Sequence, residues 1–385
     1  MRTGATANPV LIIGGGLAGL VAARLLHTAG LAFELLEARG RLGGRILSAD
    51  ASGEVSTDGF DLGPSWFWPG MQPGMAALVE ELGLPCFAQN SAGGVVIQRH
   101  PREAPQRYDG LSQEPASMRI AGGTGALVAA LASGLPASCV HLHAKVTGIE
   151  LVDNAIEVSL AGPTGPERRL RGSHGLLALP PRLIEATIPF APALDPAMAR
   201  RWRATPTWMA PHAKIFAIYD RPFWREAGLS GSAQSTVGPL VEVHDATTAS
   251  GKAALFGFVG VPADARLSAG QDALVAACVR QLASLFGPDA ARPVATLFKD
   301  WAADPFTATV DDRAAGGHPS PDRRPWVTGA WEGRISLMGS ETSITDPGYL
   351  AGAVEAAQRA VSDLMSGAGA RTQGAPKHPL STGAR

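Results

Sequence analysis

Three glycines near the amino terminus have a spacing that can bind a dinucleotide. Gly14, Gly16 and Gly19 form the pattern G-x-G-x-x-G, and Glu37 follows 18 residues after the last of them. The first glycine allows a tight turn, the second lets backbone N–H groups approach a pyrophosphate, and the third lets a helix pack on a strand. A carboxylate at the distance of Glu37 can accept hydrogen bonds from ribose hydroxyls. These residues therefore predict a dinucleotide site.

The residues after Glu37 indicate which dinucleotide is bound. The segment EARGRLGGRI has a second glycine pair, Gly43–Gly44, followed by Arg45. A nicotinamide cofactor does not need this segment, whereas a second turn could pass close to a pyrophosphate while Arg45 supplies a fixed cation. The alternative is an arginine-rich surface loop. The segment resembles the second glycine motif of FAD-containing amine oxidases, the monoamine and polyamine oxidase family.

The resemblance covers most of the chain, although most of its segments are weak signals individually. The matching segments are DGFDLGPSWFWP (58–69), HLHAKVTGIELVDN (141–154), LLALPPRL (176–183), APHAKIFAIYDRPFW (210–224), DWAADPF (300–306) and ISLMGSETSITDPGYLAGAVEAAQRA (335–360). One departure is Pro64, which stands where the family usually has a second glycine.

The resemblance implies bound FAD and oxidation of a carbon–nitrogen bond in a small amine. A hydride equivalent would pass from the α-carbon to the flavin, the imine would be hydrolysed, and O2 would reoxidise the flavin to give H2O2. The family's covalent cysteine position falls in FTATVDD (306–312), which has no cysteine, so noncovalent FAD is expected. The cofactor-binding residues that the resemblance implies are Gly14, Gly16, Ala18, Gly19, Glu37, Ala38, Arg39, Gly44, Arg45, Gly63, Pro64, Ser65, Trp66, Val146, Ser340, Glu341 and Leu350.

Two residues are expected to be catalytic. The resemblance implies that Lys214 holds a water near the flavin N5 atom and assists reoxidation or imine hydrolysis, and that Tyr349 flanks the amine. The segment 306–312 contains no tyrosine, which leaves three alternatives for the second aromatic ring of the substrate site: Phe306, Trp66 or no second ring. The expected substrate-binding residues are Trp66, Trp301, Phe306 and Tyr349. The alternatives are a lysine that points to solvent and an ordinary packed tyrosine.

Regular elements must position these residues. Residues 10–13 read as a buried strand, a helix follows from Leu17 until Gly30, and 32–36 form a second strand. Near the carboxyl end, 335–338 form a strand. Asp346 is a good N-cap with Pro347 at the first helical position, and the positive end of this helix would favour an anion. Its predicted apolar face consists of Leu350, Val354, Ala357, Val361 and Leu364.

The predicted fold class is α/β, with two interleaved domains and a tail. Residues 1–65, 121–185 and 325–366 form a Rossmann-like FAD-binding domain of the GR2 type. Residues 66–120 and 186–324 form an α+β substrate domain with an antiparallel sheet. Residues 367–385 have almost no large apolar side chains, which predicts a disordered tail.

Composition excludes several other functions. Lys and Arg number 33 against 34 Asp and Glu, so bulk charge favours neither nucleic acid nor a membrane surface. The three cysteines form no CxxC, which argues against a disulfide framework or a metal site. The apolar run at Val10 is too short for a membrane span, so a cytoplasmic protein is expected. Oligomeric state is left open.

Three other functions fit the same residues less well. A related flavoenzyme could use the scaffold as a desaturase or isomerase on a non-amine substrate. A nicotinamide-dependent dehydrogenase and a non-catalytic dinucleotide-binding module are the others. The glycine turn beside Arg45, Lys214 and the helix at Pro347 count against these last two.

Overall fold

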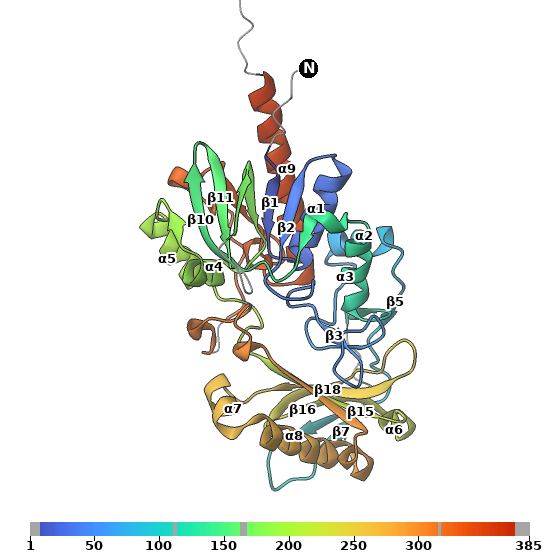
Figure 1. Ribbon diagram of the computed structural model, residues 1–385. Coiled ribbons are helices and arrows are strands. Elements are labelled where there is room, and N and C mark those ends of the chain that lie inside the picture. Colours follow the sequence, from blue (N-terminus) through green and yellow to red (C-terminus); the bar gives the residue numbers. More distant parts are fainter. Residues whose placement is uncertain (1–7, 111–113, 162–167, 315–316, 374–385) are drawn as a thin grey trace, which may run out of the picture.

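The computed structural model describes residues 8–110, 114–161, 168–314 and 317–373. Figure 1 shows an upper α/β domain and a lower domain built on a broad sheet, with the chain passing between them several times. The predicted fold class, an α/β domain interleaved with a second, sheet-containing domain, is confirmed.

The upper domain is organised around a five-stranded sheet in the order β20-β13-β1-β2-β9, in which every neighbouring pair is parallel. Its strands are β1 (Val10–Ile13), β2 (Phe33–Leu36), β9 (Val140–His141), β13 (His174–Leu177) and β20 (Ile335–Leu337). Ile13 is in register with Leu36, so Gly14 and Glu37 leave the sheet side by side at its carboxyl edge. Ligands bind at this edge in open parallel sheets.

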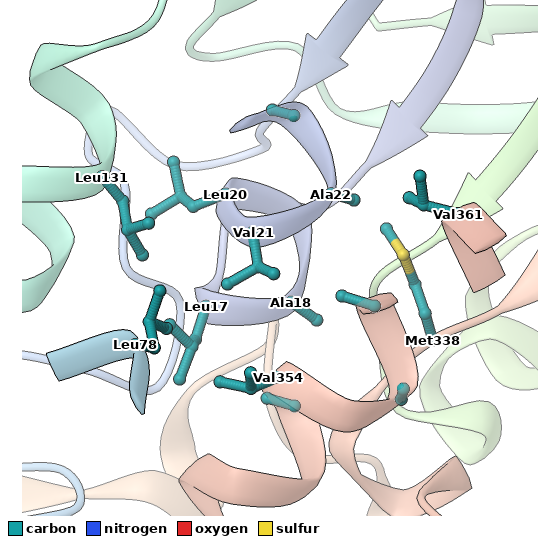
Figure 2. Packing of buried hydrophobic residues seen from close by; sticks show 14 of the residues in the cluster. Leu17, Ala18, Leu20, Val21, Ala22, Leu78, Leu131, Met338, Val354 and Val361 are labelled. Atoms are coloured by element: carbon teal, nitrogen blue, oxygen red, sulfur yellow. The ribbon is translucent and has the colours of Figure 1, made fainter. Parts of the chain in front are cut away.

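Four helices form the main core of this domain: α1 (Leu17–Thr28), α2 (Pro73–Glu81), α3 (Thr124–Ser133) and α9 (Leu350–Gln373). Figure 2 shows Leu17 and Val21 of α1 meeting Leu78 of α2 and Val354 of α9. Each such buried side chain contributes roughly 1.5–3 kcal/mol relative to exposure. This packing fixes the start of α1, where the dinucleotide pattern lies.

The predicted start of the last helix is wrong. Asp346 and Pro347 lie in a turn, and α9 begins at Leu350. Gly348 has φ +84°, outside the helical region, and a Cβ there would lie 2.8 Å from the Trp208 Cβ. The close contact with Trp208 therefore requires a glycine at position 348. The positive φ of this glycine keeps the helix from beginning before Leu350. The predicted apolar face is confirmed, since Leu350, Val354, Ala357 and Val361 are buried and Leu364 packs against them.

The first residues of the predicted tail are helical. Helix α9 continues from residue 367 to Gln373, and Figure 1 shows its end projecting from the upper domain. Residues 367–373 contain no proline, so the backbone hydrogen bonds of the helix can continue to Gln373. The rest of the predicted tail, 374–385, lies outside the described residues.

The lower domain contains a seven-stranded sheet in the order β19-β15-β18-β17-β16-β6-β7. Its strands are β6 (Gly94–Gln98), β7 (Gln106–Tyr108), β15 (Ala213–Tyr219), β16 (Leu229–Ser235), β17 (Leu240–Asp245), β18 (Ala253–Val259) and β19 (Ala295–Asp300). The predicted antiparallel pairing holds except between β16 and β6, which are parallel. Helices of this domain are α6 (Phe223–Glu226), α7 (Ala263–Ala269) and α8 (Gln271–Phe286).

The two faces of β15 serve different cores. Ile215 and Ala217 pack with Leu282 of α8, whereas Phe216 packs with Phe60 toward the upper domain. Because side chains alternate along a strand, Lys214 lies on the same face as Phe216. The sheet therefore turns Lys214 toward the space between the domains.

A four-stranded sheet, in the order β12-β11-β10-β14, flanks the parallel sheet. It consists of β10 (Val146–Val152), β11 (Ala155–Leu160), β12 (Arg168–Gly172) and β14 (Phe190–Ala191). Strands β11 and β12 are antiparallel, and residues 162–167 between them lie outside the described residues. Small pairs are made by β3 (Ser48–Ala49) with β4 (Phe60–Asp61), and by β5 (Cys86–Ala88) with β8 (Met118–Ile120).

Two segments assigned to the substrate domain pack with the other domain instead. Helix α2, within 66–120, lies in the core of α1 and α9. Beyond residue 186, Met198 and Trp202 of α5 (Pro196–Ala204) pack with α4 (Pro181–Thr187) and the four-stranded sheet. An amphipathic helix can dock on either domain, so its sequence alone does not assign it.

Candidate functional site

A cavity of about 300 Å³ lies where the two domains meet the edge of the parallel sheet. It is lined from both domains, by the turns after β1 and β2 and by residues on the face of β15 that carries Lys214. The sequence-predicted residues that line it are Gly14, Gly16, Ala18, Glu37, Arg39, Gly44, Arg45, Gly63, Pro64, Ser65, Trp66, Lys214, Trp301, Phe306, Ser340, Tyr349 and Leu350.

Four predicted cofactor-binding residues do not line the cavity. Gly19 packs behind the turn, where a Cβ would lie 1.9 Å from the Gly14 carbonyl oxygen, as the proposed helix-packing role requires. Glu341 lies behind Arg45, while Val146 belongs to the core of the four-stranded sheet and Ala38 follows Glu37 outside the lining.

The first glycine turn leaves room for an anionic ligand. A Cβ built at Gly16 meets nothing closer than 3.9 Å, so this position faces open space beside Gly43 and Gly44. Helix α1 begins at Leu17 with no side-chain cap and no acidic residue in its first turn. An uncapped helix start offers backbone N–H groups and a partial positive charge. The turn therefore fits the pyrophosphate of a dinucleotide.

Glu37 is oriented by the backbone around it. One carboxylate oxygen accepts from the Gly15 N–H at 2.7 Å and the other from the Arg39 N–H at 2.8 Å. An ionised carboxylate has about four acceptor positions, so two remain for ribose hydroxyls. Only 3% of Glu37 is exposed, and the group lines the cavity.

The Arg39 side chain joins the two domains at this end. Its Nη2 donates to Asp304 at 2.7 Å and to Thr307 at 3.0 Å, and its guanidinium lies 5.3 Å from the Phe306 ring centroid. Lys299 also donates to Asp304, at 2.9 Å. Phe306 therefore lies at the dinucleotide end of the cavity. This position does not fit the prediction that Phe306 is the second aromatic ring of the substrate site.

Arg41 was not among the predicted site residues, although it supports the second glycine turn. Its guanidinium donates to the backbone carbonyls of Leu42, Gly44 and Ile46 at 2.9–3.1 Å. Burial lowers the pKa of Arg41, and the neighbouring Arg39 lowers it further. The sequence signal was an arginine two residues before a glycine pair, where a guanidinium can bond the carbonyls of the turn.

Arg45 is paired with a buried acid. Its Nη1 donates to Glu341 Oε1 at 2.5 Å and to the Trp208 carbonyl at 3.2 Å, while Nη2 donates to Glu341 Oε2 and to the Ser340 hydroxyl. The Glu341 side chain is fully buried. Arg45 lines the cavity as predicted, but its charge is balanced by Glu341, so it is not a free cation for the pyrophosphate.

Lys214 points into the cavity, which excludes the alternative in which it faces solvent. Its Nζ donates to the Gly63 carbonyl at 2.6 Å, the Ser65 hydroxyl at 3.2 Å and the Asp61 carbonyl at 3.4 Å. The rings of Phe256 and Phe258 lie 4.7 and 5.1 Å from the same atom. Burial lowers the pKa of Lys214 to about 7, because an ammonium is poorly solvated there.

A buried carboxylate supports the loop that receives Lys214. Asp61 accepts from the hydroxyls of Ser48 and Thr124 and from the Thr124 N–H, at 2.5–2.9 Å. Burial raises the pKa of the Asp61 carboxyl, and these hydrogen bonds oppose the rise. Leu62, the next residue, accepts from the Trp301 indole N–H at 3.0 Å. Lys214 and Trp301 thus hold successive carbonyls of one loop.

The aromatic surroundings of Tyr349 differ from the prediction. Its ring lies 6.0 Å from Trp68 at 89° and 4.7 Å from His318 at 35°, and His318 lies 4.3 Å from Trp208. Trp66 instead packs against Phe256 beside Lys214. Trp68 and Trp208 line the cavity, whereas His318 is outside the lining and contacts Trp208 and Tyr349.

The sequence did not identify Trp208 or His318 because neither lies in a motif near Tyr349. Their rings meet Tyr349 only through the tertiary fold. Further lining residues that were missed are Leu17, Ile46, Trp68, Ala178, Leu179, Pro180, Met209, Phe258, Gly339, Gly348 and Ala353, whereas Gly43 belongs to the predicted second glycine turn.

The low pKa of Lys214 gives a testable dependence of stability on pH. In the unfolded chain a lysine titrates near 10.4, so between about pH 7 and 10 the unfolded state binds more protons than the folded state. Stability therefore rises with pH over this range, by about 1 kcal/mol per pH unit. We expect the Tm of the parent, relative to Lys214→Met, to rise from pH 7 to pH 9 in saturating FAD.

The matched control is Lys252→Met, which removes an exposed lysine beside Asp58. The Tm of this control should change with pH as the Tm of the parent does. If the difference in Tm between the parent and Lys214→Met stays constant from pH 7 to pH 9, the assigned pKa of Lys214 is wrong.

Within the described chain, no group of three or more His, Cys, Asp or Glu side chains could hold a metal ion. None of the helices described is long and apolar enough to cross a membrane. The cytoplasmic location stays a prediction.

Comparisons with known proteins agree with this geometry. Residues 104–365 match the family described as flavin containing amine oxidoreductase, and residues 12–82 match an NAD(P)-binding Rossmann-like domain. A relative from Mycobacterium tuberculosis, the putative flavin-containing monoamine oxidase AofH, is 30% identical over 265 residues, which cover 64% of this chain and 52% of the relative. The chain spans about half the length of the curated relatives it matches.

Two solved structures share the fold. Putrescine oxidase bound to putrescine superposes with a TM-score of 0.77 at 22% identity, covering 94% of this chain and 99% of that chain. Cyclohexylamine oxidase from Brevibacterium oxydans gives 0.76 at 19% identity, covering 94% and 100%. At these identities the likeness shows the fold alone.

Proposed function

Because this chain belongs to the flavin containing amine oxidoreductase family, we propose that it binds FAD noncovalently and oxidises a small amine to an imine, with O2 as electron acceptor and H2O2 as product. One observation carries the proposal. A single cavity joins the dinucleotide turn at Gly14 and Gly16 to a buried lysine, Lys214, and to the ring of Tyr349. The desaturase or isomerase alternative has no observation in its favour.

When bound, FAD would accept a hydride equivalent from the α-carbon of the amine and pass the electrons to O2. The chain would hold it through backbone N–H groups at the start of α1 and through the Glu37 carboxylate. Arg41 would act indirectly, by fixing the Gly43–Gly44 turn. These roles for individual residues are part of the proposal.

Lys214 would supply a proton-carrying group at the other end of the cavity. Near neutral pH it exists in both protonation states, because its pKa is about 7. Its ammonium form can stabilise negative charge that develops on oxygen, and its amine form can accept a proton from a water. The groups in contact with its Nζ atom are two backbone carbonyls, one hydroxyl and two phenyl rings, and none of these exchanges a proton near neutral pH.

The function is tested by reduction of the bound flavin. Purified protein should be yellow, and an anaerobic amine should bleach the flavin absorbance, with H2O2 formed when air is admitted. The control is the same preparation with the corresponding alcohol in place of the amine. The proposal would be overturned if none of a panel of primary, secondary and tertiary amines bleached the flavin absorbance.

The flavin should be released intact by acid or heat. Three cysteines occur in the chain, and none of them lines the cavity: Cys86, Cys139 and Cys278. The absence of a cysteine from this lining supports noncovalent binding of the flavin. After denaturation and filtration, FAD should appear in the filtrate in full amount by absorbance and chromatography. Flavin that stays on the denatured chain would contradict noncovalent binding.

A further inference from the structure

The charges that line the cavity restrict the substrate to one class. Resting on the proposed function, we infer that this site oxidises amines whose remainder is uncharged and apolar, and that it discriminates against diamines and amino acids. Trp208 is the residue that we assign to the recognition of this apolar remainder. The assignment depends on the lack of any free opposite charge where a second ionised group of the substrate would lie.

A second ammonium group would need a carboxylate near it. Among the described residues that line the cavity, Glu37 is the sole acid, and it accepts hydrogen bonds at the dinucleotide end. Glu341 lies behind Arg45, and its oxygens accept from Arg45 and from the Ser340 hydroxyl. An ammonium group buried without a partner is strongly disfavoured. A diamine therefore gains nothing from its second nitrogen and loses its hydration.

A substrate carboxylate would need a free cation. Both Nη atoms of Arg45 already donate to Glu341, and they also donate to Ser340 and to the Trp208 carbonyl. Lys214 has an acceptor for each of its three ammonium hydrogens. Arg39 pairs with Asp304 at the far end. A carboxylate in the cavity would have to displace one of these partners.

Most of the remaining wall is aromatic or aliphatic, and its two hydroxyl side chains, Ser65 and Ser340, already accept hydrogen bonds from Lys214 and Arg45. Trp66, Trp68, Phe258 and Tyr349 contribute rings, and Met209 adds a flexible thioether side chain. Such side chains recognise apolar groups by burial of surface. An aromatic face can also attract a desolvated cation by about 2 kcal/mol, but the desolvation of an unpaired ammonium group costs several kcal/mol.

Trp208 holds a defined position in this wall. Its side chain approaches the backbone of Gly348 so closely that a Cβ on Gly348 would lie 2.8–3.2 Å from three of its atoms. His318 lies against its ring and against Tyr349, so the three rings support one another. The next residue, Met209, has φ +64°, an uncommon conformation for a residue other than glycine. Trp208 is therefore fixed rather than free to move aside.

Matched pairs of amines test the inference in the holoenzyme. Hexylamine and 1,6-diaminohexane differ by one ammonium group, and 2-phenylethylamine and L-phenylalanine differ by one carboxylate. We expect kcat/KM for the uncharged member of each pair to exceed that of its partner by at least about 100-fold, because a mispaired buried charge is strongly rejected. A charged member with equal or greater kcat/KM overturns the inference and leaves amine oxidation intact. Failure of all four amines to reduce the flavin counts against the proposed function instead.

Two variants at Trp208 test its role. Trp208→Glu supplies a carboxylate, so the ratio of kcat/KM for 1,6-diaminohexane over hexylamine should rise about 10-fold or more. Trp208→Phe keeps an apolar ring and should keep the parent's order of preference, but its smaller contact area should raise KM for both hexylamine and 2-phenylethylamine. Flavin content and Tm show whether each variant is folded. If both variants are folded and have the parent's ratio, Trp208 does not determine the specificity. If Trp208→Glu is unfolded, Trp208→Phe still decides, because a parent-like KM for hexylamine and for 2-phenylethylamine would contradict contact with the substrate.

Discussion

Lys214→Met slows reoxidation of the reduced enzyme by O2 by about 100-fold or more, while anaerobic reduction by the amine changes by less than about 10-fold. Methionine keeps most of the length and the apolar packing against Phe256 and Phe258, and it removes the charge. Reoxidation develops negative charge on oxygen, which a buried cation stabilises strongly. Hydride transfer from the amine to the flavin depends mainly on how the two are aligned. Its rate is therefore less sensitive to the charge of Lys214.

The protonation state of Lys214 adds a second readout. The pKa of Lys214 is about 7, so the cationic fraction falls as the pH rises through neutrality. The reoxidation rate of the parent should therefore decline above about pH 7, and the decline should be absent in Lys214→Met. Lys252→Met is the matched control, because Lys252 is an exposed lysine on the far side of the loop at Asp58. Stopped-flow traces that match the parent in both half-reactions would leave Lys214 with a structural role only.

Arg45→Ala should destabilise the protein by roughly 3–5 kcal/mol and lower its flavin content. The reason is the Glu341 side chain, which is fully buried and has Arg45 as its ion-pair partner. Removing the guanidinium leaves an uncompensated charge beneath the cavity. The loss is larger than that of a single charge-assisted hydrogen bond to the cofactor, which is worth about 1.5–3 kcal/mol.

The double variant Arg45→Met/Glu341→Gln separates the two roles of the pair. It removes both charges, so it should regain most of the stability lost in Arg45→Ala. If Arg45 also contacts the cofactor, FAD affinity should stay low in the double variant. Chemical denaturation measures the free energy of unfolding, and titration with FAD measures the cofactor affinity independently. A single variant as stable as the parent would show that water enters beside Glu341.

The sequence alone determined the parts of the site that are local. Gly14 and Glu37 lie at the ends of two short apolar strands joined by one helix, so spacing and periodicity sufficed to predict a parallel βαβ unit with a dinucleotide turn at its edge. The hydrophobic face of α9 was predictable for the same reason. These features depend on residues within one or two neighbouring elements.

The tertiary structure decided what distant segments do to one another. Arg45 and Glu341 are 296 residues apart, and no local pattern shows that the cation is neutralised. Strand β15 is buried on both faces, so its sequence could not say on which side Lys214 lies. Helices α2 and α5 have apolar faces that fit either domain, and only packing assigns them. The start of α9 is set by Gly348, because Trp208, 140 residues earlier, occupies the space that any other side chain at position 348 would need.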